Sequence, residues 1–181
     1  MTVAIVGSGC HAKMLAVHIN EECRFYHSSE EIPDDMVVIN GIGNVAVIGN
    51  SGLHLRRSVF DKHISHIGGV AHKTAVLAGT VDKAVQVMAL AVINANAHVG
   101  DNTIINTGAI IEHDCKVGKH CHMAPGVILC GNVVVGDLSH IGAGSVVLQN
   151  ITVGTGCVVA AGSVVTRDVP DGMSWLRGNI L

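Results

Sequence analysis

The sequence has few aromatic residues, with one Trp, one Tyr and two Phe among 181 residues. So small a number of aromatic side chains is consistent with a protein whose interior is narrow and filled by Val and Ile. Long uninterrupted apolar runs are also missing, because Asn, His, Gly or Asp breaks each one before about 18 residues, which argues against a membrane-spanning helix. We therefore expect a soluble protein with no membrane insertion.

Clustered positive charge is missing as well. The formal net charge is −3 and no basic run occurs, which argues against nucleic-acid binding. A basic region followed by an apolar stretch, the pattern of a signal peptide, is not found near the N-terminus, so a cytoplasmic location is expected. The six cysteines form no CxxC pair, and Cys115, Cys121 and Cys157 are predicted to be reduced core residues.

What the sequence does contain is a period of six. A period of six fits neither an amphipathic helix nor a continuous strand, but it suits short strands separated by regular turns. Because alternate residues of a strand point to opposite sides, each sixth residue and the residue two before it are predicted to point inward. The apolar sixth residues, with no insertion among them, are Ala75, Val81, Val87, Ile93, Val99, Ile105, Ile111, Val117, Met123, Leu129, Val135, Ile141, Val147, Val153, Val159 and Val165.

This stretch resembles the hexapeptide-repeat family. In that family three such strands close one triangular coil of a left-handed parallel β-helix, against the usual right-handed crossover. Eighteen residues then make one coil, and residues 72–170 would give roughly five coils, each supported only by its neighbours.

The same spacing predicts three outward faces, of which one is apolar throughout. A soluble monomer does not normally expose such a patch, so we predict self-association, which the resemblance makes a homotrimer. Coverage by a C-terminal segment or another partner is the alternative. The outward residues are Val92, Ile110, Ile128, Val146 and Val164 on the apolar face, His98, Lys116, Val134 and Thr152 on the second, and Gln86, Ile104, His122, His140 and Val158 on the third.

The first 63 residues show a different pattern of apolar strands, glycine turns and helical spacing. Strands are predicted at 2–6, 24–27 and 36–40, and helices at 11–20 and 53–63. The fold class is thus a small Rossmann-like α/β domain, residues 1–63, followed by a left-handed β-helix domain, residues 64–181. Sheets of this kind bind ligands at the loops that follow their strands.

Gly7, Gly9 and Ala12 match the GxGxxA pattern, in which a backbone approaches a pyrophosphate at a helix N-terminus. No acidic residue ends the second strand, and the domain is too short for two nucleotide-binding halves, which disfavours a nicotinamide dinucleotide. A nucleotide-diphosphate ligand and a purely structural tight turn both remain open.

The segment Ile110-Ile111-Glu112-His113-Asp114-Cys115 is the best candidate for chemistry. An imidazole flanked by carboxylates at a coil corner can be oriented and made more basic by one of them, so His113 is the predicted general base. Glu112 and Asp114 both remain possible partners, and a solvated corner histidine is the alternative. His122 and His140 should stack on adjacent coils as a ligand surface; no metal site is predicted, because zinc needs a third protein ligand.

Several motifs together make nearly the whole chain similar to the NeuD/PglD-like family of sugar O- and N-acetyltransferases. The matching segments are Gly7-Ser8-Gly9-Cys10-His11-Ala12-Lys13, Gly41-Ile42-Gly43-Asn44, Asn106-Thr107-Gly108-Ala109-Ile110-Ile111-Glu112-His113-Asp114-Cys115, His120-Cys121-His122-Met123-Ala124-Pro125-Gly126 and Cys130-Gly131-Asn132-Val133.

The resemblance implies acetyl-CoA as co-substrate, held along the β-helix between subunits, and a nucleotide-linked amino sugar of the UDP-4-amino-sugar type as acceptor in bacterial-type glycan biosynthesis. By position, His113 matches the catalytic histidine and Asp114 the carboxylate that raises its basicity. The sugar-nucleotide loops are matched by Gly7, Ser8, Gly9, Cys10, His11 and Gly43, and the acetyl-CoA groove by Asn106, His122, Gly131 and Ala143.

Two other functions stay open at this point. An O-acetyltransferase acting on a sialic acid or another hydroxyl would use the same His113 with an alcohol nucleophile. A non-catalytic partner protein of a sugar pathway is the other, although intact His113 and Asp114 argue against it.

Overall fold

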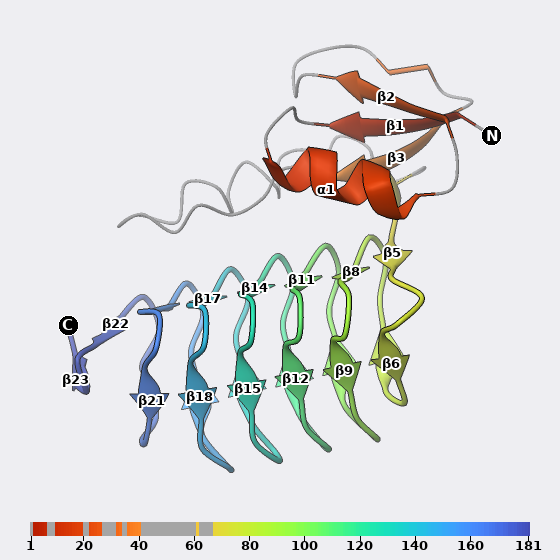
Figure 1. Cartoon of the computed structure of the whole chain (residues 1–181). Helices are drawn as coiled ribbons and strands as arrows, with labels where there is room; N and C mark the ends of the chain where they lie inside the picture. Colours follow the sequence, from red (N-terminus) through yellow and green to blue (C-terminus); the bar gives the residue numbers. More distant parts are fainter. Residues whose placement is uncertain are drawn as a thin grey trace.

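The computed structural model describes residues 2–6, 10–19, 22–26, 32–33, 36–40, 61 and 67–181. A small sheet with one helix lies beside the first coils of a β-helix that continues to the C-terminal strands (Figure 1). No helix in these ranges is long and apolar enough to cross a bilayer.

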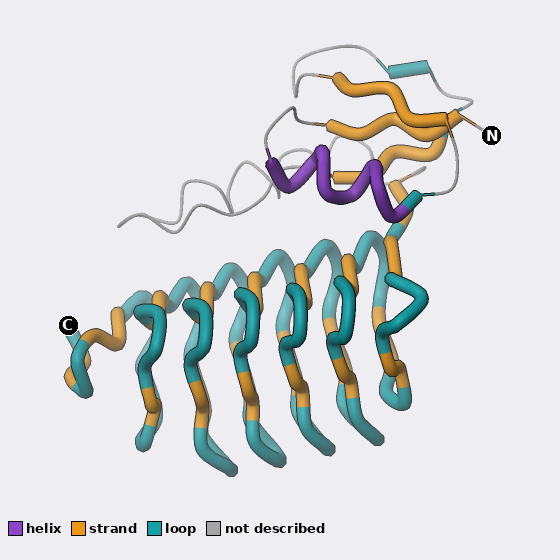
Figure 2. Tube along the Cα trace, viewed as in Figure 1, coloured by secondary structure: helices purple, strands orange, loops and turns teal. Residues whose placement is uncertain are grey.

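Short parallel strands joined by turns build the β-helix (Figure 2). They form three sheets, which we name the histidine face, the apolar face and the polar face. The histidine face consists of β5 (Val70–Ala71), β8 (Gln86–Val87), β11 (Ile104–Ile105), β14 (His122–Met123), β17 (His140–Ile141), β20 (Val158–Val159), β22 (Ser174–Leu176) and the antiparallel β23 (Asn179–Ile180). The apolar face consists of β6 (Val76–Leu77), β9 (Val92–Ile93), β12 (Ile110–Ile111), β15 (Ile128–Leu129), β18 (Val146–Val147) and β21 (Val164–Val165). The polar face consists of β7 (Thr80–Val81), β10 (His98–Val99), β13 (Lys116–Val117), β16 (Val134–Val135) and β19 (Thr152–Val153).

The predicted repeat is confirmed from β7 onward, where Val81 pairs with Val99, and is wrong in the two strands before it. Ile110 pairs with Val92 and Ile128, each 18 residues away, as predicted. Val76, however, pairs with Val92, so the first coil is two residues shorter at this point. Gly79, in the turn between β6 and β7, lies directly against the next coil, because a Cβ there would clash with the carbonyl oxygen of Ala97.

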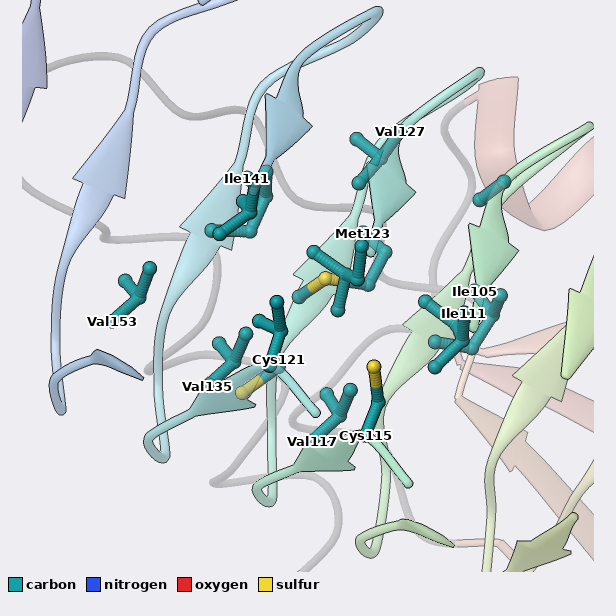
Figure 3. Packing of buried hydrophobic residues seen from close by; sticks show 14 of the residues in the cluster. Ile105, Ile111, Cys115, Val117, Cys121, Met123, Val127, Val135, Ile141 and Val153 are labelled. Carbon is teal, nitrogen blue, oxygen red and sulfur yellow. The ribbon is translucent and has the colours of Figure 1, made fainter. Parts of the chain in front are cut away.

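The interior of the β-helix is filled by the predicted inward residues, which Figure 3 shows meeting between the three sheets. Cys115, Cys121 and Cys157 are buried free thiols, as predicted, and burial raises the pKa of Cys121 to about 12. Trp175 in β22 is buried at the C-terminal end of the same cluster.

The N-terminal unit is a four-stranded parallel sheet in the order β2-β1-β3-β4, with one described helix. The predicted helix at 53–63 and the turns at 7–9 and 41–43 lie outside the described residues, apart from Asp61. With one short helix among the described residues, the Rossmann-like assignment is not supported. The elements are β1 (Thr2–Val6), α1 (Cys10–His18), β2 (Glu22–Tyr26), β3 (Val37–Asn40) and β4 (Ile67–Gly68).

The strand predictions are confirmed within two residues, since β2 begins at Glu22 and β3 at Val37. The fourth strand comes from Ile67–Gly68, beyond the predicted boundary at residue 63, so the division into 1–63 and 64–181 stays a prediction.

The N-terminal unit packs against the first turn of the β-helix. Leu15 of α1 belongs to the same buried cluster as Met88, while Ala84 belongs to a second cluster with Val38 of β3. His11 Nε2 also lies 2.8 Å from Gln86 Oε1. Residues 84–88 of the β-helix therefore form the contact with the N-terminal unit.

The outward side chains of the histidine face are largely buried, unlike those of the other faces. Gln86 and Ile104 are fully buried, and His122 and His140 meet edge to face with ring centroids 5.1 Å apart. Burial lowers the pKa of His140 to about 4. This histidine is therefore neutral at physiological pH.

The first prediction concerns the interior. Val135 and Val81 hold the same position in two strands of the polar face, but Val135 is buried and Val81 is 38% exposed. Val135→Ala should lower the free energy of unfolding by about 2 kcal/mol and Val81→Ala by less than about 1, because only the first leaves a cavity. Denaturant titration of both variants tests this; equal losses would contradict the predicted difference in packing.

The second prediction concerns pH. Below 6.5, the ordinary pKa of histidine, the unfolded chain binds a proton at His140 that the folded chain does not, so stability falls toward pH 4. Between pH 6.5 and pH 4 the free energy of unfolding of the wild type should fall by up to roughly 3 kcal/mol more than that of His140→Gln. Urea unfolding over this range tests it, with His98→Gln, which alters an exposed histidine, as control. Parallel stability curves for wild type and His140→Gln would contradict the predicted cost of protonation.

Candidate active site

His113 lies in the turn between β12 and β13, at the corner where the apolar and polar faces meet. Its side chain is 63% exposed. The Nδ1–H of the ring donates a hydrogen bond of 2.8 Å to Asp114 Oδ2. In this tautomer Nε2 carries no proton, so it is the ring nitrogen that can accept one.

Asp114 has a left-handed backbone, with φ at 62°. Asp and Asn tolerate this conformation better than most residues, which suits a sharp coil corner. Both carboxylate oxygens are engaged, because Asn96 Nδ2 donates to Oδ1 at 3.1 Å. The hydrogen bond from His113 and then that from Asn96 lower the pKa of Asp114 below its ordinary value.

Glu112, the other candidate carboxylate, accepts a hydrogen bond from Asn94 Nδ2 at 3.0 Å. The choice left open by the sequence thus falls on Asp114 as the hydrogen-bond partner of His113. Neither Asn94 nor Asn96 was among the residues that the motifs predicted. Their spacing of 18 from Glu112 and Asp114 was the signal that could have identified both.

Gly131 occupies the same corner one coil further along. A Cβ on Gly131 would lie 2.7 Å from both Cε1 and Nε2 of His113, so any side chain there would displace the ring. The carbonyl of His113 also accepts the backbone N–H of Asn132 at 3.0 Å. The imidazole therefore lies directly against the backbone of the next coil.

Asn106, His122 and Ala143 lie elsewhere. Asn106 and Ala143 follow β11 and β17, at the corner between the histidine and apolar faces, and His122 begins β14. Asn106 Nδ2 lies 3.0 Å from His122 Nε2, and both residues are buried, whereas Ala143 is exposed.

The predicted acetyl-CoA residues are therefore divided between two corners. Gly131 lies with His113 and Asp114 on one side of the apolar face, while Asn106, His122 and Ala143 lie on the opposite side of that face. Of the predicted sugar-nucleotide residues, Cys10 and His11 begin α1, and Gly7, Ser8, Gly9 and Gly43 lie outside the described residues.

A groove of about 410 Å³ lies on the polar face and does not include His113. Two ion pairs involve residues that line it: His98 Nε2 lies 3.3 Å from Asp82 Oδ2, and Lys119 Nζ lies 2.9 Å from Asp101 Oδ2. Within the described part of the chain, no three His, Cys, Asp or Glu side chains gather in a metal-binding group.

The sequence matches the family model "Bacterial transferase hexapeptide (six repeats)" over residues 96–131, 114–149 and 132–167. A comparison with curated protein sequences gives no match.

Solved structures with a similar fold cover nearly the whole chain. The acetyltransferase domain of PglB from Neisseria gonorrhoeae is 26% identical, with a TM-score of 0.84, over 96% of this chain and 95% of that one. A mutant of perosamine N-acetyltransferase from Caulobacter crescentus, in complex with CoA and GDP-perosamine, is 28% identical, with a TM-score of 0.87, over 100% and 97%. The PglB domain in complex with acetyl coenzyme A is 28% identical, with a TM-score of 0.78, over 96% and 94%.

The repeats, the coil geometry and these similarities agree with one another. The resemblance drawn from the motifs is confirmed: residues 96–167 match the hexapeptide-repeat model, and the whole chain is similar in fold to these sugar acetyltransferases.

Proposed function

We propose that the protein is an acetyl-CoA-dependent N-acetyltransferase that acetylates the amine of a nucleotide-linked amino sugar. The acceptor is of the UDP-4-amino-sugar type, and the reaction serves bacterial-type glycan biosynthesis in the cytoplasm. The observation that carries the proposal is the His113–Asp114 hydrogen bond, at a coil corner of a fold shared with perosamine N-acetyltransferase.

His113 is the general base in this proposal. Nδ1 is bound to Asp114, so Nε2 takes the proton of the sugar amine as the amine attacks the thioester carbonyl. Asp114 keeps the ring in this tautomer and stabilises the imidazolium that forms. The Asp114 carboxylate is charged at neutral pH, and its hydrogen bonds from His113 and Asn96 lower its pKa further.

The reaction balances without a covalent enzyme intermediate. A carbon–nitrogen bond forms to the acetyl carbon and the carbon–sulfur bond to CoA breaks, after which His113 can return its proton to the CoA sulfur. The Gly131 N–H is a suitable donor to the oxyanion, because the Gly131 backbone lies against the imidazole.

A homotrimer follows from the same proposal. One chain has His113 and Gly131 at one edge of the apolar face and Asn106, His122 and Ala143 at the other. A single acetyl-CoA that contacts both groups would lie in a cleft between neighbouring chains. Val164 is 51% exposed, and the outward Ile128 and Val146 are partly exposed, so this face can pack against a second copy.

The N-terminal domain, residues 1–63, would hold the sugar nucleotide through Gly7, Ser8, Gly9, Cys10, His11 and Gly43. Cys10 and His11 lie in the first turn of α1, the end of a helix that attracts phosphate. His11 Nε2 lies 2.8 Å from Gln86 Oε1, so the beginning of α1 is in contact with the β-helix along which acetyl-CoA would bind.

The third prediction is catalytic. With acetyl-CoA and UDP-, GDP- or dTDP-linked amino sugars, the wild type should release free CoA thiol only when an acceptor is present. His113→Ala should lower kcat by about 10² to 10⁴, the usual contribution of a general base. Thiol release followed with a chromogenic disulfide tests this.

The matched control is His98→Ala, because His98 also lies beside an aspartate but on the polar face. Its kcat should equal that of the wild type. Release with hydroxyl sugars alone would show an O-acetyltransferase instead, and no release with any acceptor would favour a non-catalytic partner protein. Unchanged kcat in His113→Ala would exclude His113 as the base.

The fourth prediction is that the apolar face forms the trimer contact. Wild-type protein should have the mass of three chains, and Ile128→Glu the mass of one, because the substitution buries a charge in the contact. Lys116→Glu on the polar face is the control and should remain a trimer. Sedimentation velocity measures all three; a trimeric Ile128→Glu, or a monomeric wild type, would overturn the proposal.

A further inference from the structure

We infer that Asn96 is a positioning residue, whose side-chain amide holds the Asp114 carboxylate in the orientation that accepts the hydrogen bond from His113 Nδ1–H. This inference rests on the proposed function of His113. It adds a member of the site that the motifs did not predict and that lies one coil before the histidine.

Asn96 lies next to Asp114, at the equivalent corner position of the preceding coil. The two residues are 18 apart, and Asn96 Nδ2 donates to Asp114 Oδ1 at 3.1 Å. The other oxygen, Oδ2, accepts from His113 Nδ1 at 2.8 Å. The three side chains form one chain of hydrogen bonds, from amide to carboxylate to imidazole.

Asp114 needs such a constraint because its side chain is 50% exposed. The torsion that turns a carboxylate is broad and roughly two-fold, so water alone would not fix it. A donor on Oδ1 leaves Oδ2 facing the ring. The amide thereby favours the tautomer in which Nε2 of His113 is free to accept a proton.

The same corner contains an internal comparison. Asn96, Asp114, Asn132 and Asn150 recur every 18 residues, each with φ between 59° and 63°. Asn132 Nδ2 donates to Asn150 Oδ1 at 2.9 Å, just as Asn96 donates to Asp114. The residues before them, Gly131 and Gln149, are not histidines, so the Asn132–Asn150 bond orients no imidazole.

The experiment compares Asn96→Ala with Asn150→Ala. Both side chains are exposed, both backbones are left-handed and each variant removes one corner hydrogen bond, so similar losses of melting temperature are expected. Asn96→Ala should lower kcat by about 3- to 10-fold with KM unchanged, because only the proton transfer is disturbed. Asn150→Ala should keep the wild-type kcat.

A second measurement does not depend on turnover. Nitrogen-15 spectra of His113, recorded at a pH where the ring is neutral, report which ring nitrogen carries the proton. The Nδ1–H tautomer should be less populated in Asn96→Ala than in the wild type, and unchanged in Asn150→Ala. A merely structural role for Asn96 would not move this ratio.

The two measurements separate this inference from the proposed function. If the wild type acetylates no acceptor, the tautomer ratio still tests whether Asn96 orients the pair. An unchanged ratio in Asn96→Ala would overturn the inference. So would a loss of kcat in Asn150→Ala equal to that in Asn96→Ala, since the effect would then belong to the corner as a whole.

Discussion

The backbone register between successive coils is the constraint on which the rest of the structure depends. Each coil hydrogen bonds to the next, as Glu112 N–H does to the carbonyl of Leu129 at 3.0 Å. Residues 18 apart are therefore neighbours, while residues six apart lie on different faces. The register brings Gly131 against His113 and Asn96 beneath Asp114, although no local sequence motif joins them. It also stacks the two inward side chains of each repeat on those of the neighbouring coils, which fills the interior.

Burial then decides what each histidine can do. His140 is 8% exposed, and desolvation lowers its pKa to about 4, so it stays neutral at physiological pH. His113, at an exposed corner, keeps contact with water and with a carboxylate whose own pKa is lowered. A base that must gain and return a proton needs such surroundings, because an imidazolium without a counter-charge is costly to bury. Position in the coil thus separates the proposed general base, His113, from the buried ring of His140.

Much of the fold could be predicted from the sequence, because a strict period of six specifies both strand length and inward positions. Cys115 and Cys121 were placed correctly for that reason. The shortened first coil was missed, since Ala75 happens to keep the period although Leu77 holds the register with Ile93. The choice between Glu112 and Asp114 depended on side-chain orientation, which adjacency in sequence does not determine. Both carboxylates flank the histidine, yet their asparagine partners come from the preceding coil.

A triangular coil also limits what one chain can assemble. Residues that follow β12 and β15 gather at one corner, and residues that follow β11 and β17 gather at another, with the apolar face between them. Further coils add residues to each corner along the axis of the β-helix, but they do not bring the two corners closer together. A ligand that touches both must lie across apolar strands or between two chains. The apolar face must be covered, and the two corners must reach one ligand. The proposed trimer meets both requirements, because packing the apolar face against a neighbour removes it from water and places one chain's His113 corner close to another chain.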